Sequence, residues 1–326
     1  MMHPVARMDG QGADAVTGRV VWSPAKSLWN MTMLAGAIGL APLFVTPGAV
    51  AMFLVTTYCS LLLGHSVGMH RRFIHRSYSC RKWLERALVY IGVLVGVAGP
   101  FAILRIHDER DWAQRQTACH DFFAHRRSPL VDLFWQLNCR FRFARPPVFA
   151  IEPEFAHDTW YRFLQGTWML QQLPIALACF AIGGWSWLIW GVPVRICVSV
   201  IGHWSITYWC HNPGPGRWRV RNAAVQASNL PGLGLLTYGE CWHNNHHAFP
   251  ESARIGLAKG EADPAAWIIE ALAKIGWTWN LGTPRPESQR EDLELVAREV
   301  GSPVDVRGNH GVRQLSVRSN QVSNRG

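Results

Sequence analysis

The sequence predicts an all-α integral membrane protein with four transmembrane helices and a cytoplasmic helical cap rich in histidine. Residues 27–70 and 163–194 contain no Asp, Glu, Lys or Arg, and most of the 14 histidines gather in short clusters beside such apolar segments. Charged residues make up 17% of the chain, against about 25% in soluble domains. This composition excludes an ordinary soluble enzyme and a disordered chain, and it leaves a polytopic membrane protein.

The N-terminal segment, residues 1–26, is expected to lie in the cytoplasm. Its first 21 residues contain Pro4 and three glycines but no apolar run, so the segment does not have the pattern of a signal peptide. The first hydrophobic block therefore indicates an uncleaved membrane segment.

The first apolar block predicts two spans, near 28–45 and 48–65. A crossing needs roughly 20 helical residues, and Thr46-Pro47-Gly48 supplies a break between the two. The turn carries no basic residue, whereas both outer flanks do, so both termini and the cap are predicted to be cytoplasmic. The flanking basic residues are Arg19, Lys26, Arg71, Arg72, Arg76, Arg81 and Lys82.

The second apolar block predicts spans near 163–182 and 185–208, with the break at Gly183-Gly184. Arg195 lies inside the second of these spans. A charge at that depth is costly unless it faces protein or water. Two interpretations stay open: burial against backbone carbonyls, or a contact near the site or with an acyl headgroup.

A third apolar stretch, from Ala87 to Leu104, is only marginally long enough to cross a membrane. Three glycines and Pro100 weaken it as a straight helix. We predict an interfacial helix over about 86–104, which keeps the histidines on one side. Residues 281–326 show little apolar periodicity, and we expect a flexible C-terminal tail.

The cysteine pattern indicates the redox compartment of the cap, and the net charge indicates which partners the chain binds. The eight cysteines contain no C-x-x-C pair, which argues against a zinc ribbon or a disulfide framework and favours a reducing side for the cap. The formal charge of +10 favours binding to anionic lipid headgroups over binding to nucleic acid. We expect membrane lipid as a partner and no nucleic acid.

The histidines fall at the predicted cytoplasmic ends of the apolar blocks. Neutral imidazole is the commonest metal-binding side chain, and in H-x-x-H-H the three rings share one helix face and are expected to converge. A single histidine there is usually an ordinary polar residue, but so many in clusters predict a metal site with more ligands than tetrahedral zinc takes. The clustered histidines are His65, His70, His75, His107, His203, His211, His243, His246 and His247.

Three segments together resemble the membrane fatty acid desaturases, in the acyl-CoA branch that includes the stearoyl-CoA (delta-nine) enzymes. They are HRRFIHRSY at 70–78, GGWSWLIWGVPVR at 183–195 and GECWHNNHHAFP at 239–250. The resemblance covers about residues 28–275 and implies a membrane desaturase domain over 27–280. It also implies a histidine-ligated di-iron centre in the cap, an acyl tunnel, and no catalytic group beyond the metal centre.

Carried over residue by residue, the resemblance implies metal ligation by His70, His75, His107, His211, His243, His246 and His247. The middle box departs from the family pattern, because HDERD places Arg110 and Asp111 where two histidines are expected. Thr207 likewise replaces an asparagine. The residues expected to support the centre or contact substrate are Thr207, Asn244, Arg195 and Trp204.

We hypothesise that His65, His203 and Asp111 restore the ligand count, since histidines at the edge of a membrane are costly and usually functional. The alternative is that Asp111 forms an ordinary ion pair with Arg110 or Arg115, and that His203 lines the tunnel. His120 and His125 lie in the polar cap, and they are weaker ligand candidates than the other clustered histidines.

The implied reaction is the O₂-dependent introduction of a double bond into a saturated acyl chain. An unactivated C–H bond is too strong for acid–base chemistry, so the cofactor, two iron ions, must supply the oxidant. The acyl carrier is CoA, acyl carrier protein or a lipid, and the electron donor is a separate ferredoxin-like or cytochrome protein. Two alternatives remain: a di-iron lipid hydroxylase, and a non-catalytic metal-binding membrane protein with a decayed redox site.

Overall fold

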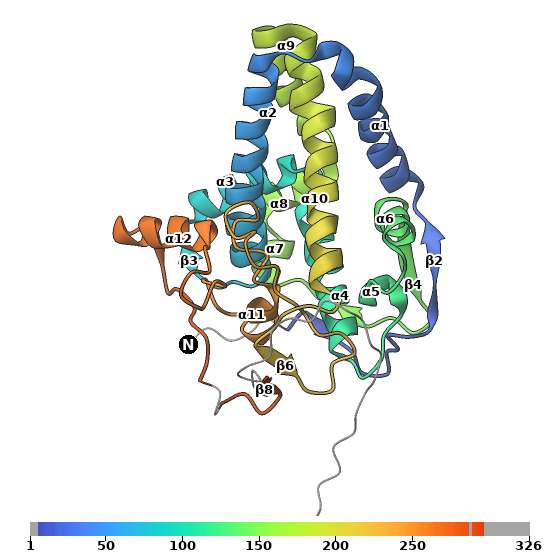
Figure 1. Cartoon of the computed structure of the whole chain (residues 1–326), viewed down its shortest axis with the longest axis vertical. Coiled ribbons are helices and arrows are strands. Elements are labelled where there is room, and N and C mark those ends of the chain that lie inside the picture. Colours follow the sequence, from blue (N-terminus) through green and yellow to red (C-terminus); the bar gives the residue numbers. More distant parts are fainter. Residues whose placement is uncertain (1–5, 287–288, 297–326) are drawn as a thin grey trace, which may run out of the picture. The chain divides into compact units, whose positions relative to one another are not determined.

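The computed structural model describes residues 6–286 and 289–296, which belong to one compact unit within Met1–Val296. This part of the chain is mostly helical, with short two-stranded antiparallel sheets. Three helical segments are long and apolar enough to cross a membrane. Figure 1 shows these segments extending on one side, with the shorter helices and strands gathered at their other end.

The first apolar block forms two helical arms. Helix α1 (Pro24–Leu40) continues as η1 (Ala41–Phe44), and α2 (Pro47–Cys59) continues as η2 (Ser60–Ile74). The turn between the arms falls at Thr46, whose hydroxyl accepts a hydrogen bond from the Ala49 amide and caps α2. The predicted break at Thr46-Pro47-Gly48 is therefore confirmed, with the first arm starting at Pro24.

The third candidate span, Gln172–Cys210, folds back on itself. It comprises α9 (Gln172–Ile189), η3 (Trp190–Val194) and α10 (Arg195–Cys210). Arg195 Nη2 donates to Gln172 Oε1 at 2.5 Å, although a straight helix would separate these residues by about 35 Å. The reversal falls at Gly184, where φ is 59° and ψ is −149°, as the sequence predicts.

The segment before this turn is not the single spanning helix predicted near 163–182. Helix α8 (Thr159–Thr167) ends there, and α9 begins only at Gln172. The helical stretch from 172 to 183 is only about 18 Å long. Arg195 also donates to the carbonyls of Gly191 and Leu94, which agrees with the first of its two interpretations, burial against backbone carbonyls.

The three long apolar segments expose large apolar side chains. Contiguous exposed apolar surface is rare on soluble proteins, and a lipid bilayer removes its cost. The structure thus supports the predicted membrane segments. The most exposed of these side chains are Leu28, Ile38, Leu43, Leu54, Val55, Leu177 and Ile182.

The predicted interfacial helix over 86–104 is instead two helices, α3 (Lys82–Leu94) and α4 (Pro100–Arg115). The chain breaks between them because Gly96 has a φ of 86°, which disfavours residues with a Cβ, and because Pro100 starts a new helix. Helix α3 packs closely on η2, where a Cβ on Gly64 would clash with the Gly92 amide nitrogen. The break lets α4 turn toward the cap and bring His107 with it.

The remaining elements build the cap. The helices are α5 (Asp121–Ala124), α6 (Pro129–Asn138), α7 (Pro153–Ala156), α11 (His243–Ala248) and α12 (Pro264–Lys274). The strand pairs are β1 (Met8–Asp9) with β5 (Val148–Phe149), β2 (Gly18–Trp22) with β4 (Cys139–Phe143), β3 (Ser79–Cys80) with β7 (Thr278–Trp279), and β6 (Trp218–Val220) with β8 (Leu293–Leu295).

The described parts of both terminal segments pack on the cap. Arg7 is buried and donates to Glu152 at 2.7 Å. At the other end, β8 pairs with β6, and Arg285 binds Glu251 at 3.1 Å. Within the tail predicted to be flexible over 281–326, residues 281–286 and 289–296 thus include strand and ion-pair partners, and the flexibility of the tail stays a prediction. The rest of the predicted tail lies outside the described residues.

Candidate metal centre

The first three clustered histidines follow the unusual geometry of η2. The Pro47–Ile74 segment changes at Ser60 from an α-helix to a π-helix, in which backbone hydrogen bonds join residues five apart. The His75 amide accordingly donates to the His70 carbonyl at 3.0 Å. A five-residue spacing that would spread side chains around an α-helix thus brings His70 and His75 to one side.

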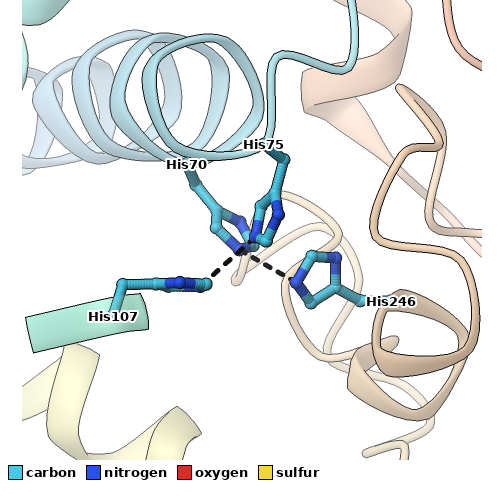
Figure 2. A group of neighbouring side chains, drawn as sticks. All are labelled: His70, His75, His107 and His246. Atoms are coloured by element: carbon cyan, nitrogen blue, oxygen red, sulfur yellow. Dashed lines mark hydrogen bonds between the residues drawn. The ribbon is translucent and has the colours of Figure 1, made fainter. Parts of the chain in front are cut away.

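Four histidines from three elements converge at the end of η2. Figure 2 shows His70 and His75 facing His107 from α4 and His246 from α11. The Nε2 atoms of His70 and His246 lie 3.2 Å apart, and those of His75 and His107 also lie 3.2 Å apart. A metal with bonds of about 2.1 Å places neighbouring ligands roughly 3.0–3.4 Å apart. We call this set the four-histidine group.

A second set, the three-histidine group, consists of His211, His243 and His247. The Nε2 atom of His211 lies 3.3 Å from those of His243 and His247, which are 3.1 Å from each other. Each Nε2 carries either one proton or one lone pair, so hydrogen bonds cannot satisfy all three contacts. A cation bound by the three lone pairs would satisfy them, and the group therefore fits a metal.

Helix α11 contributes histidines to both groups. His246 belongs to the four-histidine group, whereas His243 and His247 belong to the three-histidine group. The expectation that all three rings converge on one point is therefore wrong. On an α-helix, residues three and four after a given position lie on opposite sides of it, so a single turn can address two adjacent points.

The outer nitrogens of two grouped histidines have the partners found in known metal sites, where the second ring nitrogen meets a carboxylate or a carbonyl. His70 Nδ1 lies 2.7 Å from Glu240 Oε2, and His211 Nδ1 donates to the Thr207 carbonyl at 2.7 Å. Because a carbonyl can only accept, Nδ1 of His211 carries the proton, and Nε2 of the neutral ring is free to bind a metal. Thr207 thus acts through its backbone.

Glu240 is a functional residue that the sequence analysis missed. Burial alone would raise the pKa of Glu240, but His70, Arg71 and Ser66 hold it well below its usual range. The carboxylate is therefore ionised beside the four-histidine group. Its signal in the sequence was a lone acidic residue within GECWHNNHH.

Burial also lowers the pKa of five of the seven grouped histidines, which keeps these imidazoles in the neutral form that metals bind. The affected members are His75 and His246 of the four-histidine group, and His211, His243 and His247 of the other.

The structure places Asp111 beside His107 and outside both groups. Asp111 Oδ2 is 3.7 Å from His107 Nδ1, the outer nitrogen, while Oδ1 is 3.9 Å from Arg110 Nε. Asp108 shares that side, at 3.4 Å from the same nitrogen. Ligation by Asp111 stays a prediction.

His65 and His203 lie against each other next to the four-histidine group. Their rings are perpendicular with centroids 4.7 Å apart, and the His65 ring stacks over that of His70 at 6.3 Å. Neither ring is in either group. Their role as replacement ligands also stays a prediction.

His125 and Trp204 meet at a buried carboxylate. The Asp132 side chain is fully buried, lies 3.0 Å from His125 Nδ1, and accepts from Trp204 Nε1 at 2.8 Å. The His125 ring stacks on that of His211 at 5.5 Å. This network supports the three-histidine group from behind.

Two other residues that the sequence analysis named, Asn244 and His120, accept hydrogen bonds from backbone amides of the cap. Asn244 accepts from the amides of Arg217 and Trp218 at 2.8 and 2.9 Å, and so holds the β6 segment on α11. His120 caps α5 and packs its ring on Phe141 at 4.6 Å. His120 is in neither group.

A cavity of about 500 Å³ opens in the cap beside His75 and Asp111. Arginines and carboxylates line it, among them Arg7 with Asp108 and Arg285 with Glu251. The cavity reaches the four-histidine group from the side of the cap.

Comparison with known proteins supports the resemblance that the histidine-containing segments indicated. The fatty acid desaturase family model matches residues 45–280. The sn-2 palmitoyl-lipid 9-desaturase of Nostoc sp. (strain 36) is 31% identical over 243 residues, which are 73% of this chain and 82% of the relative. Delta-9 acyl-lipid desaturase 2 of Arabidopsis thaliana is 30% identical over 266 residues, covering 79% of this chain and 82% of the relative. The icosanoyl-CoA 5-desaturase of Limnanthes douglasii is 27% identical over 288 residues, covering 84% and 76%. The chain therefore belongs to the fatty acid desaturase family, and it is an oxidoreductase that acts on fatty acyl chains.

Proposed function

We propose that this protein introduces a double bond into a saturated fatty acyl chain, using O₂ and a di-iron centre held by the two histidine groups. The observation that carries the proposal is the convergence of seven imidazoles into two sets with ligand spacing, joined through one turn of α11. Imidazole suits iron. Each group would hold one iron, and the two groups adjoin at His243 and His246, whose ring centroids are 5.6 Å apart.

When bound, two iron ions supply the oxidant for removing one hydrogen atom from each of two neighbouring carbons. The balanced reaction consumes one O₂, two electrons and two protons and forms two water molecules besides the double bond. The chain holds the imidazole rings in place through Glu240 and the Thr207 carbonyl. Burial of the ligands excludes bulk water, which prevents side reactions of the oxidant.

The proposed substrate is an acyl chain carried by a membrane lipid. The printed names of the Nostoc and Arabidopsis relatives give acyl lipids as substrates, whereas that of the Limnanthes relative gives an acyl-CoA. The identities of 31% and 30% with the lipid-acting relatives, against 27% with the acyl-CoA relative, support the first. Acyl-CoA and acyl carrier protein remain as outcomes of the test.

The electrons are proposed to come from a separate ferredoxin-like or cytochrome protein. Iron–sulfur clusters need several cysteines together, and across residues 6–286 and 289–296 the candidate metal groups contain histidine alone. A donor must therefore dock on the chain from outside.

Four membrane crossings are proposed, with both termini and the cap in the cytoplasm. The reversals at Thr46 and Gly184 support two helical hairpins that enter and leave on one side. Basic residues flank the cap ends of the first pair and are absent from its turn. The test uses a reporter enzyme that is active only outside the cytoplasm. It should be active when fused after Thr46 or Gly184 and inactive when fused after Ala258.

The reaction is tested by expression in cells that lack a desaturase, together with a ferredoxin and its reductase. Cells receive deuterium-labelled palmitate, and lipid, CoA and carrier-protein fractions are analysed by mass spectrometry. A product lighter by two hydrogens, absent in His246→Ala, supports desaturation. A product that gains one oxygen would identify a hydroxylase instead.

A further inference from the structure

We propose that the antiparallel pair of β2 and β4 binds the head group of an anionic phospholipid through Arg19, Arg140 and Arg142. These strands pair over Gly18–Trp22 and Cys139–Phe143, and we call the pair the arginine ribbon. The partner is a phosphate-bearing lipid with a net negative charge, in the leaflet on the cap side. The ribbon shares no residue with either histidine group, so the inference does not depend on the proposed reaction.

The first argument is that one face of the arginine ribbon packs on the cap while the other carries the arginines. Side chains alternate between the two faces of a strand. Phe141 and Phe143 pack against a hydrophobic cluster of the cap. Arg140 and Arg142 alternate with them along β4, and both are exposed, as is Arg19 on β2. The fold of the cap thus fixes an outer face that is basic.

The second argument is the register of the two strands. Arg19 lies directly opposite Arg142, and like charges directly across a strand pair are destabilising. The pair of β6 and β8 shows the opposite arrangement, because Arg219 lies opposite Glu294. An anion bound between Arg19 and Arg142 would remove their repulsion.

The third argument is that the chain itself does not supply this anion. Arg145, just past the end of β4, reaches Asp14 at 3.3 Å. Across residues 6–286 and 289–296, no salt bridge includes Arg19, Arg140 or Arg142. Guanidinium groups bind phosphate oxygens through charge-assisted hydrogen bonds that are often bidentate. The outer face therefore has the chemistry of a phosphate site.

The fourth argument is the distance from the membrane. Strand β2 ends at Trp22, and α1 starts at Pro24. The 21 residues of α1 and η1 have a length of about 30 Å, which matches the hydrocarbon core and puts Pro24 at its edge. At about 3.3 Å per strand residue, Arg140, opposite Val21, lies at most about 10 Å from that edge, and Arg19 at most about 17 Å.

These distances place the arginines at the lipid head groups. The head-group layer adds about 5–7 Å on each side of the hydrocarbon core, and the negative potential of an anionic leaflet decays over about 8 Å beyond it. Trp22, at the membrane end of β2, is 63% exposed, and tryptophan is enriched at this level of a membrane. Figure 1 shows β2 and β4 directly below the first arm, whereas β6 and β8 lie toward the opposite end of the cap.

The experiment measures lipid binding to the full chain in mild detergent by native mass spectrometry. The probes are dioleoyl phosphatidylglycerol and dioleoyl phosphatidylcholine, which differ only in the head group. We expect the wild type to bind the first phosphatidylglycerol about tenfold or more tightly than the first phosphatidylcholine. Replacing Arg19, Arg140 and Arg142 together by Gln should reduce this preference to less than about threefold.

The matched control replaces Arg217, Arg219 and Arg221 together by Gln. These arginines are exposed and lie on or beside β6, so the control removes the same charge from the other end of the cap. It should keep the preference of the wild type. Equal affinity of the wild type for the two lipids, or an equal loss of preference in the control, would overturn the inference.

Arg19→Glu separates the lipid site from the stability of the ribbon. It places a carboxylate opposite Arg142, as Glu294 stands opposite Arg219. The midpoint of thermal unfolding in lipid-free detergent should therefore rise, because opposite charges across a strand pair are stabilising, while the preference for phosphatidylglycerol falls several-fold. An unchanged preference in this variant would contradict the proposal even if the triple variant does not fold.

An acidic ferredoxin is the competing partner for a basic surface. Its affinity is measured by light scattering against the wild type and the triple variant at low and physiological salt. Binding of the ferredoxin to the wild type alone, with no preference for phosphatidylglycerol over phosphatidylcholine, would make the arginine ribbon a protein-docking surface and the lipid site wrong. A preference for phosphatidylglycerol that the triple variant loses, with equal ferredoxin binding by both proteins, supports the lipid site.

Discussion

The four-histidine and three-histidine groups are built from the same side chain and share one turn of α11, yet their surroundings are opposite. Carboxylates stand behind the first, at Glu240 and Asp108, whereas the second has a backbone carbonyl behind His211 and the guanidinium of Arg115, which donates to the His247 carbonyl. Groups beyond the ligands tune metal affinity. The comparison teaches that counting histidines does not predict how strongly each group binds metal.

The largest effect should come from removing one ligand of each group. His246→Ala should weaken metal binding in the four-histidine group by at least about 100-fold and leave the other group loaded. His247→Ala, one residue along the helix, should do the reverse. Metal content by mass spectrometry and Co²⁺ titration distinguish the two.

His120→Ala is the control, since that ring caps α5 and packs on Phe141. It should retain the wild-type metal content. If His246→Ala and His247→Ala lost the same metal ion with equal affinity changes, the division of α11 between two groups would be wrong.

A smaller effect should follow from neutralising the carboxylate behind the first group. Glu240→Gln keeps the shape but loses the charge that faces His70 at 2.7 Å. Metal affinity should fall about 10- to 100-fold in the four-histidine group alone. Glu270→Gln, which breaks an exposed pair with Arg254, should leave both affinities unchanged in the same titration.

The metal-free protein should lose stability as pH falls below about 6.5. Burial lowers the pKa of all three members of the three-histidine group, so the unfolded chain binds more protons there than the folded chain. Each such histidine contributes up to about 1.4 kcal/mol per pH unit. His243→Gln should reduce the slope by about that amount in denaturant titrations at several pH values. An unchanged slope would show that His243 titrates equally in both states.

Much of this arrangement follows from local sequence. The breaks at Thr46-Pro47-Gly48 and Gly183-Gly184 were predictable because proline and glycine end helices, and seven clustered histidines were recognised by spacing and resemblance. The division of 86–104 depended on a left-handed φ at Gly96 and a close helix contact at Gly64. The glycines and Pro100 weakened this stretch as a straight helix, but the approach of Gly64 to Gly92 and the contact of Glu240 with His70 join residues distant in sequence, so no local pattern contained them.

The smallest expected effect concerns His65 and His203, the histidines predicted to replace the two ligands missing from the HDERD segment. Their rings contact each other at 4.7 Å and belong to neither group. Because neither ring belongs to either group, His65→Ala and His203→Ala should change Co²⁺ affinity by less than about threefold in each group. A loss of one metal ion in either variant would instead make these histidines ligands. The same titration therefore decides whether His65 and His203 compensate for the two histidines missing from the middle box.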